Sequence, residues 1–301
     1  MRKFLKYIAL LVIGIIVLMV SIDILYTFIY TKSSPRNKIQ LIMNVPPRHY
    51  DVIIIGSSRA ENHIVTEMFE KKGIRTFNFA MAGAALCETS LQLKLFFERG
   101  NTADQILLQA DTNFQKEGPA EGVKAKYMPY LPSNPTIYKH FQHYDREQAD
   151  ALKYMPMYRY WLYDAVIGFR EMCMLVVRKP SKYLQNGGFM ELTERMGKEE
   201  PSLLYEEFLG KNYDYDEIVA TCKARNVPLF SFCTPVCKNV LKPDYFKRLE
   251  KAIPNLHDFS KVVQEDSLFA TCGHMNVQGA RIFTAYVLDS LKIGKQTRQK
   301  Q

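Results

Sequence analysis

The body of the sequence lacks a cluster of basic residues, although the whole chain carries a formal net charge of +9. Six of the positive charges come from the two ends of the chain, at Arg2, Lys3, Lys6, Lys295, Arg298 and Lys300. The residues between these ends are therefore closer to neutral in sum. A nucleic-acid-binding surface needs basic residues gathered on the folded body. The sequence argues against nucleic acid as a partner.

The sequence also lacks the repeated cysteine pairs that form zinc sites. Cys233 and Cys237 lie close together in the chain, but no second pair of similar spacing accompanies them. We therefore expect neither a metal nor another cofactor. The six cysteines are an even number, which permits disulfides in an oxidising compartment. Buried thiols that act as small hydrophobic side chains would explain them equally well.

A third absence concerns the apolar segment near the N-terminus, which no small-x-small cleavage site follows. The segment reads YIALLVIGIIVLMVSI from Tyr7 to Ile22 and continues, after Asp23, as ILYTFIY to Tyr30. At about 1.5 Å per residue it can cross a hydrocarbon core roughly 30 Å thick. A signal peptide would share the basic start and apolar core, but the missing cleavage site favours an uncleaved anchor. Residues 1–30 are thus expected to form a cytoplasmic start and a single transmembrane helix.

A polar linker over residues 31–49 precedes the main domain, which we expect to span residues 50–301. Basic residues flank the anchor on both sides, so the positive-inside rule does not place this domain. With 301 residues and 47% hydrophobic content, the chain suits one large domain, or one and a half.

Strands and helices alternate in the first part of this domain. Val52 to Ile55 is a β-branched run without polar alternation, which is typical of a strand buried on both faces. The pattern then predicts a helix over 59–72, a strand over 75–79, a helix over 86–99 and a strand over 105–108. It returns later with a helix over 214–225, a strand over 227–232 and a last helix over 277–291.

This alternation predicts an α/β fold with a doubly wound, flavodoxin-like parallel sheet in a three-layer α/β/α arrangement. In such sheets the ligand site lies beyond the carboxyl ends of the strands. Residues 114–212 interrupt the pattern and are expected to be a mostly helical insertion, with one helix over 158–177. The insertion contains an aromatic and methionine-rich stripe that serves as packing surface or as a binding surface: Met155, Met157, Tyr158, Tyr160, Trp161 and Tyr163.

Four short blocks resemble the SGNH (GDSL-like) hydrolase superfamily. "GSS", residues 56–58, follows the first strand, "FNFAMAG" ends at Gly83, "ADTNF" contains Asn113, and "GHMNVQGA" begins at Gly273. The resemblance covers most of residues 50–115 and 214–290. It implies a serine nucleophile at Ser58 and a histidine base at His274, with an oxyanion hole formed by Ser58, Gly83 and Asn113. Ser57 stands where many relatives have aspartate.

The implied chemistry is acyl transfer. A serine hydroxyl is a poor nucleophile until a base takes its proton, and the resulting oxyanion needs hydrogen-bond donors. The chain departs from the superfamily at Thr271, where relatives have an aspartate that orients the histidine. Thr271 or Asp266 is a candidate orienter for His274, and loss of catalysis is the alternative. Each residue also has a simpler reading, since Ser58 alone suits a helix N-cap and Asn113 alone a turn.

The expected topology also brings two cysteines near the same loops. Cys237 follows the fourth strand, and Cys272 lies two residues before His274. We predict a Cys237–Cys272 disulfide from this placement, with a catalytic cysteine at 272 as the second interpretation.

The resemblance, together with the anchor, implies a bacterial membrane-anchored serine esterase or O-acyltransferase. The expected substrate is an acylated glycan or other cell-envelope polymer, with acetyl as the acyl group. An integral-membrane acyltransferase is an implied partner. The domain would be periplasmic or otherwise extracytoplasmic. The alternative is an inactive module of the same fold that binds an envelope glycan or such an acyltransferase.

Overall fold

The computed structural model of the protein describes residues 1–195, 210–238 and 244–291. Lys295, Arg298, Lys300 and residues 196–209 of the expected insertion lie outside the described residues. The chain divides into two compact units, Met1–Val45 with Glu121–Pro180 and Pro46–Ala120 with Ser181–Gln301. We call the first the helical unit and the second the sheet unit. The expected insertion is thus divided, because only Glu121–Pro180 joins the N-terminal segment.

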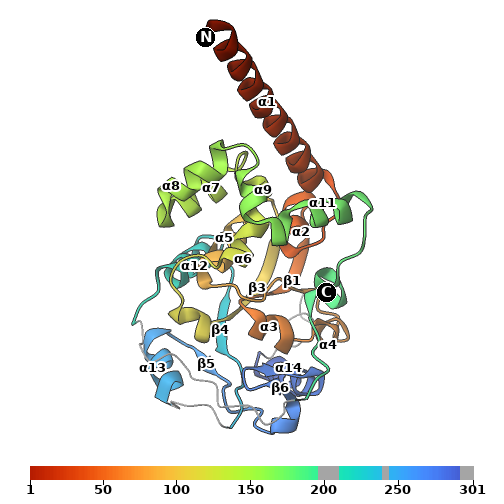
Figure 1. Cartoon of the computed structure of the whole chain (residues 1–301). Helices are drawn as coiled ribbons and strands as arrows, with labels where there is room; N and C mark the ends of the chain where they lie inside the picture. The colour runs from red at the N-terminus through yellow and green to blue at the C-terminus, as the bar shows by residue number, and fades with distance from the viewer. Residues whose placement is uncertain (196–209, 239–243, 292–301) are drawn as a thin grey trace. The chain divides into compact units, whose positions relative to one another are not determined.

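The sheet unit contains a five-stranded parallel sheet, which confirms the α/β class (Figure 1). The strand order is β2-β1-β3-β4-β5. The strands are β1 (His49–Ile55), β2 (Thr76–Asn78), β3 (Thr102–Gln109), β4 (Leu229–Cys233) and β5 (His257–Asp258). Neighbouring strands pair in parallel throughout, as in Ile53 with Phe77 and with Ile106. A separate antiparallel hairpin consists of β6 (Phe269–Thr271) and β7 (His274–Met275).

Six α-helices accompany the sheet in the described part of this unit. They are α3 (Ser58–His63), α4 (Thr66–Glu70), α5 (Leu86–Glu98), α12 (Tyr213–Ala224), α13 (Asp244–Ala252) and α14 (Val277–Ser290). Short 3-10 turns occur at η1 (Thr112–Gln115), η3 (Lys182–Leu184), η4 (Asn186–Gly188) and η5 (Asp266–Leu268). Val52 and Ile54 of β1 pack in one buried cluster with Phe283 and Val287 of α14. Burial of each such side chain stabilises the fold by about 1.5–3 kcal/mol.

The helix predicted over 59–72 is wrong as a single element, because the chain forms α3 and α4 with a break at Ile64 and Val65. Asn78 at the end of β2 explains the break. Its side-chain amide donates to the carbonyls of Ala60 and Ile64, at 2.8 and 3.3 Å. The Ala60 carbonyl also keeps its helical bond from the N–H of Ile64, whereas the N–H of Met68, which would bond to Ile64 in a continuing helix, donates to Val65 instead. A contact from a distant strand therefore ends the helix.

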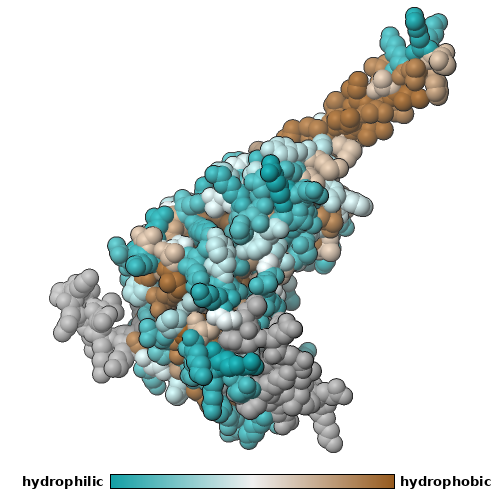
Figure 2. All heavy atoms as spheres, turned by 90° about the vertical axis from the view of Figure 1, so that its left-hand side faces the viewer, coloured by the Kyte–Doolittle hydropathy of each residue, from teal (hydrophilic) through white to brown (hydrophobic). Residues whose placement is uncertain are grey.

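The helical unit begins with α1 (Arg2–Lys32), the one helix among the described residues that is long and apolar enough to span a membrane. Figure 2 shows it as a rod of hydrophobic residues with hydrophilic residues at its N-terminal end. The expected linker contains a further helix, α2 (Lys38–Asn44), which Asn37 caps by accepting from the backbone of Gln40 at 2.9 Å. The segment predicted as a polar linker over 31–49 therefore contains a short helix.

The rest of the helical unit is a series of short helices. They are α6 (Glu121–Lys124), η2 (Ala125–Tyr130), α7 (Pro135–Tyr144), α8 (Arg146–Tyr154), α9 (Tyr158–Leu162), α10 (Asp164–Ile167) and α11 (Phe169–Val176). The single helix expected over 158–177 is therefore wrong. The chain turns at Gly168, where a Cβ would lie 1.8 Å from the Asp164 carboxylate. In the aromatic stripe, Tyr160 and Tyr163 are buried, whereas Trp161 is exposed.

Candidate active site

The turn after β1 gives its two adjacent serines different surroundings. Gly56 has a φ of +140°, and a Cβ there would lie 2.7 Å from Oε1 of Gln109, so only glycine fits. The backbone N–H and the Oγ of Ser57 both donate to that same oxygen at 2.8 Å. Ser57 Oγ also accepts from the backbone of Arg59 as the N-cap of α3. Ser57 is therefore the structural serine of the pair.

Ser58, the first residue of α3, contacts a histidine instead. Its Oγ lies 2.8 Å from Nε2 of His274, which starts β7 and follows 216 residues later in the chain. Both side chains are partly accessible to solvent. The structure thus brings together the two residues that the sequence predicts as nucleophile and base.

The other ring nitrogen of His274 meets a hydroxyl. Nδ1 lies 3.2 Å from Oγ1 of Thr271, its cross-strand partner in the β6–β7 hairpin. When Ser58 donates to Nε2, Nδ1 carries the ring proton and donates it to Thr271. Asp266, the other candidate orienter, is exposed in η5, and within the described residues it forms no hydrogen bond to this ring.

The surroundings of His274 favour its neutral form. Burial lowers the pKa of the ring below its usual value of 6.5, and the nearby Arg59 cation lowers the pKa further. The Asp111 carboxylate acts in the opposite direction, and its effect is the smallest of the three. A neutral imidazole is the form that can accept a proton from serine, so His274 is ready to act as a base at pH 7.

A buried ion pair that the sequence analysis missed lies beside this pair of residues. Arg59 Nε is 3.3 Å from Asp111 Oδ2, with side-chain exposures of 6% and 0%. Arg59 also donates to the hydroxyl and the carbonyl of Thr234, at 2.7 and 2.8 Å. Asp111 in turn accepts from the backbone and the hydroxyl of Thr234. The network joins the start of α3 to the ends of β3 and β4, and thereby fixes the turn that carries Ser58.

A second histidine supports the hairpin from inside. His63, the last residue of α3, is fully buried, and its Nε2 accepts from the backbone N–H of Met275 at 2.9 Å. Its ring lies edge-on to His274, with the ring centroids 6.1 Å apart. Burial lowers the pKa of His63 well below 6.5, so the ring is neutral. One end of α3 therefore carries Ser58 while its other end positions the strand of His274.

The predicted disulfide between Cys237 and Cys272 is present. The backbone N–H of Cys237 also donates to the carbonyl of Cys272 at 3.1 Å. The segment after β4 is therefore attached to the hairpin two residues before His274. The second interpretation, a catalytic cysteine at 272, is wrong because this sulfur is bonded to another sulfur. Within the described residues, the other four cysteines form no disulfide: Cys87, Cys173, Cys222 and Cys233.

The glycine turn expected to contribute to an oxyanion hole is held against the serine turn. Gly83 is exposed and has a φ of +81°, in the region that favours glycine. Two residues earlier, the N–H of Met81 donates to the carbonyl of Gly56 at 3.0 Å. Glu61 of α3, which sequence reasoning missed, accepts from the N–H of Ala82 at 2.9 Å. The Gly83 amide as an oxyanion donor stays a prediction.

Asn113, the third expected donor, has its side-chain amide engaged by the end of β3. Its side chain is 1% exposed and folds back on the end of β3. The amide nitrogen donates to the carbonyl of Gln109 at 3.1 Å, and the amide oxygen accepts from the N–H of Asp111 at 3.0 Å. These contacts are those of a turn residue. Within the described residues, the structure has no hydrogen bond between Asn113 and Ser58.

Two residues of the late motif have structural roles. Asn276 is the N-cap of α14, and its side-chain oxygen accepts from the N–H groups of Gln278 and Gly279, both at 3.1 Å. A Cβ on Gly279 would lie 2.3 Å from the carbonyl oxygen of Leu268, so the close approach of α14 to this segment requires glycine. Within His-x-Asn-x-x-Gly, only His274 faces the serine.

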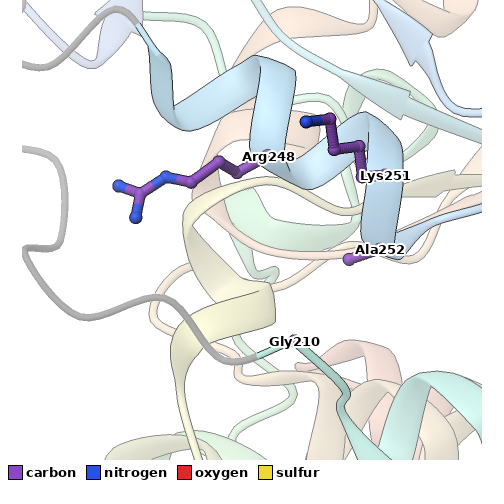
Figure 3. Close-up of a pocket in the computed structure, with 4 residues that line it drawn as sticks. All are labelled: Gly210, Arg248, Lys251 and Ala252. Atoms are coloured by element: carbon purple, nitrogen blue, oxygen red, sulfur yellow. The ribbon is translucent and has the colours of Figure 1, made fainter.

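Two other features of the sheet unit lie apart from the Ser58–His274 pair. One is a hollow lined by Gly210 and by Arg248, Lys251 and Ala252 of α13 (Figure 3). The other is a group of three potential metal ligands, His49, Asp51 and Asp104. This group is at the amino-terminal ends of β1 and β3, opposite the edge that carries Ser58. Arg75 already pairs with Asp51 at 2.9 Å.

Comparison with known proteins does not identify a family for this chain. No protein-family model matches the chain, and no curated protein matches it. The chemistry of the site itself is therefore the basis for assigning a function to this chain.

Proposed function

We propose that this protein is a membrane-anchored serine esterase or O-acyltransferase that acts through Ser58 and His274. The observation that carries the proposal is the 2.8 Å contact between Ser58 Oγ and His274 Nε2. A serine beside a neutral, oriented imidazole is the arrangement that nucleophilic acyl transfer requires. The SGNH resemblance and the strand order β2-β1-β3-β4-β5 support a flavodoxin-like, three-layer arrangement for the domain.

The proposed reaction has two steps. In the first, His274 Nε2 takes the proton of Ser58 as Oγ attacks the carbonyl carbon of an ester. The alcohol leaves with that proton, and the acyl group stays on Ser58. In the second, His274 takes a proton from water or a sugar hydroxyl, whose oxygen attacks the acyl-serine, and the ester bond to Ser58 breaks. His274 then returns that proton to Ser58 Oγ. Water gives an esterase and a sugar hydroxyl gives an acyltransferase.

We assign the oxyanion stabilisation to backbone amides. Ser58 is the first residue of α3, and the first amides of a helix have no acceptor inside the helix. The N-terminal end of a helix also favours negative charge. The Gly83 amide is the second proposed donor, because its turn is tied to Gly56 and to Glu61.

We propose that the domain is extracytoplasmic. The Cys237–Cys272 disulfide supports this location, because such bonds form and persist in oxidising compartments. An uncleaved anchor is supported by the contacts of Asp23 near the end of the apolar segment. Asp23 pairs with Arg159 at 2.5 Å and accepts from the N–H of Met157 at 2.8 Å. Cleavage after this segment would remove a partner from a buried arginine.

The substrate class follows from the resemblance and the location together. An anchored enzyme outside the cytoplasm meets acylated glycans and other envelope polymers, and acetyl is the acyl group that the resemblance implies. A membrane acyltransferase would supply acyl groups to such a domain.

A second candidate function is an inactive envelope-binding module. The observation that favours it is Thr271, because a hydroxyl orients His274 where the resembled superfamily has a carboxylate. In the serine protease template, damage to the carboxylate role lowers turnover by about 10⁴-fold. The module would then bind a glycan, or the acyltransferase, without chemistry.

A fluorophosphonate probe separates the two candidates. The full-length protein in detergent should be labelled, and Ser58→Ala and His274→Ala should each abolish labelling at this site. Ser57→Ala is the matched control, since it removes the neighbouring hydroxyl while keeping the nucleophile. Mass spectrometry should place the phosphonate on Ser58. An unlabelled wild type with a normal thermal unfolding transition would contradict the enzyme proposal and support the binding module.

A further inference from the structure

The last turns of α1 have an inner face and an outer face. From residue 23 onward, the inner side chains contact the rest of the helical unit. They are Asp23, Tyr26, Thr27 and Tyr30, which follow the i, i+3, i+4, i+7 spacing of one helix face. The outer side chains are apolar and exposed, at 63% for Ile24, 53% for Leu25 and 59% for Phe28. The apolar exterior of α1 therefore continues beyond the point where the helical unit begins to cover it.

This exterior is longer than a hydrocarbon core. From Phe4 to Phe28 the helix is about 37 Å long at 1.5 Å per residue, against a core of roughly 30 Å. A spanning helix that starts at its basic residues therefore leaves the hydrocarbon before Phe28. Its last exposed apolar turns would lie at the depth of the lipid headgroups. Residues of the helical unit that pack beside these turns would lie at that same depth.

Two short helices pack against these turns, and both expose large apolar side chains. We name these side chains the apolar collar: Trp161 and Leu162 of α9, and Phe169, Val176 and Val177 at α11. Trp161 is 74% exposed and Val177 is 69% exposed. Residues 169, 176 and 177 share one face of α11 by helical spacing. The opposite side of this helix contains the buried Leu175. α11 thus presents an apolar face to the outside.

The contacts of α9 fix the position of Trp161 relative to α1. Arg159 pairs with Asp23, and the hydroxyl of Tyr160 lies 2.8 Å from that of Thr27. Trp161 is the next residue in the same helix. Glu171 of α11 pairs with Arg36 at 2.5 Å, just after the end of α1. Figure 1 shows α9 and α11 beside the last turns of α1.

Exposed cations accompany the collar. They are Lys32 at the end of α1 and Arg170, Arg178 and Lys179 in and after α11. Basic residues next to apolar and aromatic side chains are typical of surfaces that lie in the headgroup region of anionic membranes. Tryptophan in particular is enriched at that boundary.

We infer that the apolar collar is inserted into the boundary between headgroups and acyl chains of the bilayer that α1 spans, with anionic phospholipid as its ligand. The inference rests on the proposed membrane anchoring. The helical unit is then held against the membrane by two attachments, the spanning helix α1 and the shallow apolar collar beside it. Lipid is the occupant because the collar belongs to the two helices that contact the last turns of the spanning helix α1.

The sequence provides its own probe, since Trp161 is the one tryptophan in the chain. The full-length protein is reconstituted into vesicles of phosphatidylcholine with phosphatidylglycerol, in which the phosphatidylcholine carries bromine at a shallow or a deep acyl position. Shallow bromine should lower Trp161 emission roughly twofold, and deep bromine should lower it less, because the expected depth is about 5–10 Å. Soluble iodide should quench weakly.

A second variant calibrates depth and tests the anchor separately. Trp161→Phe with Ile13→Trp places the tryptophan near the middle of α1, where deep bromine should quench most. If this probe is quenched and Trp161 is quenched only by iodide, the collar inference is overturned while the anchor stands. Shielding of Trp161 from both quenchers overturns it in favour of a second copy of the chain. If the position 13 probe also escapes bromine, the proposed anchoring fails as well.

Discussion

The Cys237–Cys272 disulfide allows a stability prediction that does not depend on catalysis. The bond closes a loop with a sequence separation of 35 residues. Loop-closure entropy for that length amounts to about 4 kcal/mol at 25 °C. In a unit of about 200 residues, 1 kcal/mol shifts the melting temperature by roughly 2–4 °C, so the double variant Cys237→Ser/Cys272→Ser should melt on the order of 10 °C lower.

The assay is thermal unfolding of the full-length protein in detergent, followed by intrinsic fluorescence and by differential scanning calorimetry. Wild type treated with a reductant should melt at the temperature of the double variant, and reductant should leave the double variant unchanged. Cys173→Ser is the matched control, since it removes a partly exposed free thiol and should behave as wild type. Reduction should also slow phosphonate labelling, because the bond holds the hairpin that carries His274.

Two results would refute this reasoning. One is a double variant that melts within about 2 °C of wild type, which would mean that residual structure already restrains the unfolded chain without the bond. The other is mass spectrometry of protein from native membranes, under non-reducing conditions, that finds both thiols free. That second result would also remove the support for an extracytoplasmic location.

Three further predictions concern single positions. Thr271→Val should slow phosphonate labelling about 2- to 10-fold, because one hydrogen bond of roughly 0.5–1.5 kcal/mol is lost. Thr271→Asp should accelerate labelling. Equal labelling rates for the two variants would contradict the orienting role of Thr271. The rate of labelling should rise with pH through an apparent pKa below 6.5 and stay constant above it, because the pKa of His274 is lowered and its neutral form is the base. A midpoint above pH 7 in stopped-flow measurements would contradict this prediction. Gly56→Ala should cost about 1–3 kcal/mol in the free energy of unfolding, since its Cβ would meet Gln109 at 2.7 Å; calorimetry showing no loss would count against the turn geometry.

Local patterns predict most of the sheet unit. The β-branched run before Gly56 predicts β1. The helix predicted over 86–99 corresponds closely to α5, which ends just before Gly100, a residue with a φ of +82°. These elements depend on their own residues and on their burial. The rule that strand ends of a parallel sheet share one edge accounts for the place of Ser58 but not for that of His274, which lies in the separate β6–β7 hairpin. The pairing of these two residues is expected from the SGNH resemblance.

Other elements depend on contacts that no local pattern contains. The helix over 59–72 divides after His63, where the Asn78 amide donates to the carbonyl of Ile64. The helix over 158–177 divides at Gly168, where a Cβ would meet the Asp164 carboxylate. Asn113 follows β3 as expected, but its side-chain amide donates to the carbonyl of Gln109.

The buried Arg59–Asp111 pair has only a weak sequence signal, which is an arginine directly after the serine pair and an aspartate at the end of a buried strand. A charged residue in such a position needs a partner nearby. His63 has no comparable signal, because its role depends on the backbone of a hairpin more than two hundred residues later.

In the segment GHMNVQGA, His274 contacts Ser58, whereas Asn276 and Gly279 support the fold, and this difference has an evolutionary consequence. Asn276 caps α14, and Gly279 allows α14 to approach Leu268 closely. The fold therefore requires both residues, whether or not the protein turns over a substrate. A chain of this fold without catalysis could therefore keep Asn276 and Gly279 and differ only at position 274. Searches that score the segment as a whole would then count scaffolds among enzymes, and the identity of that one side chain would tell them apart.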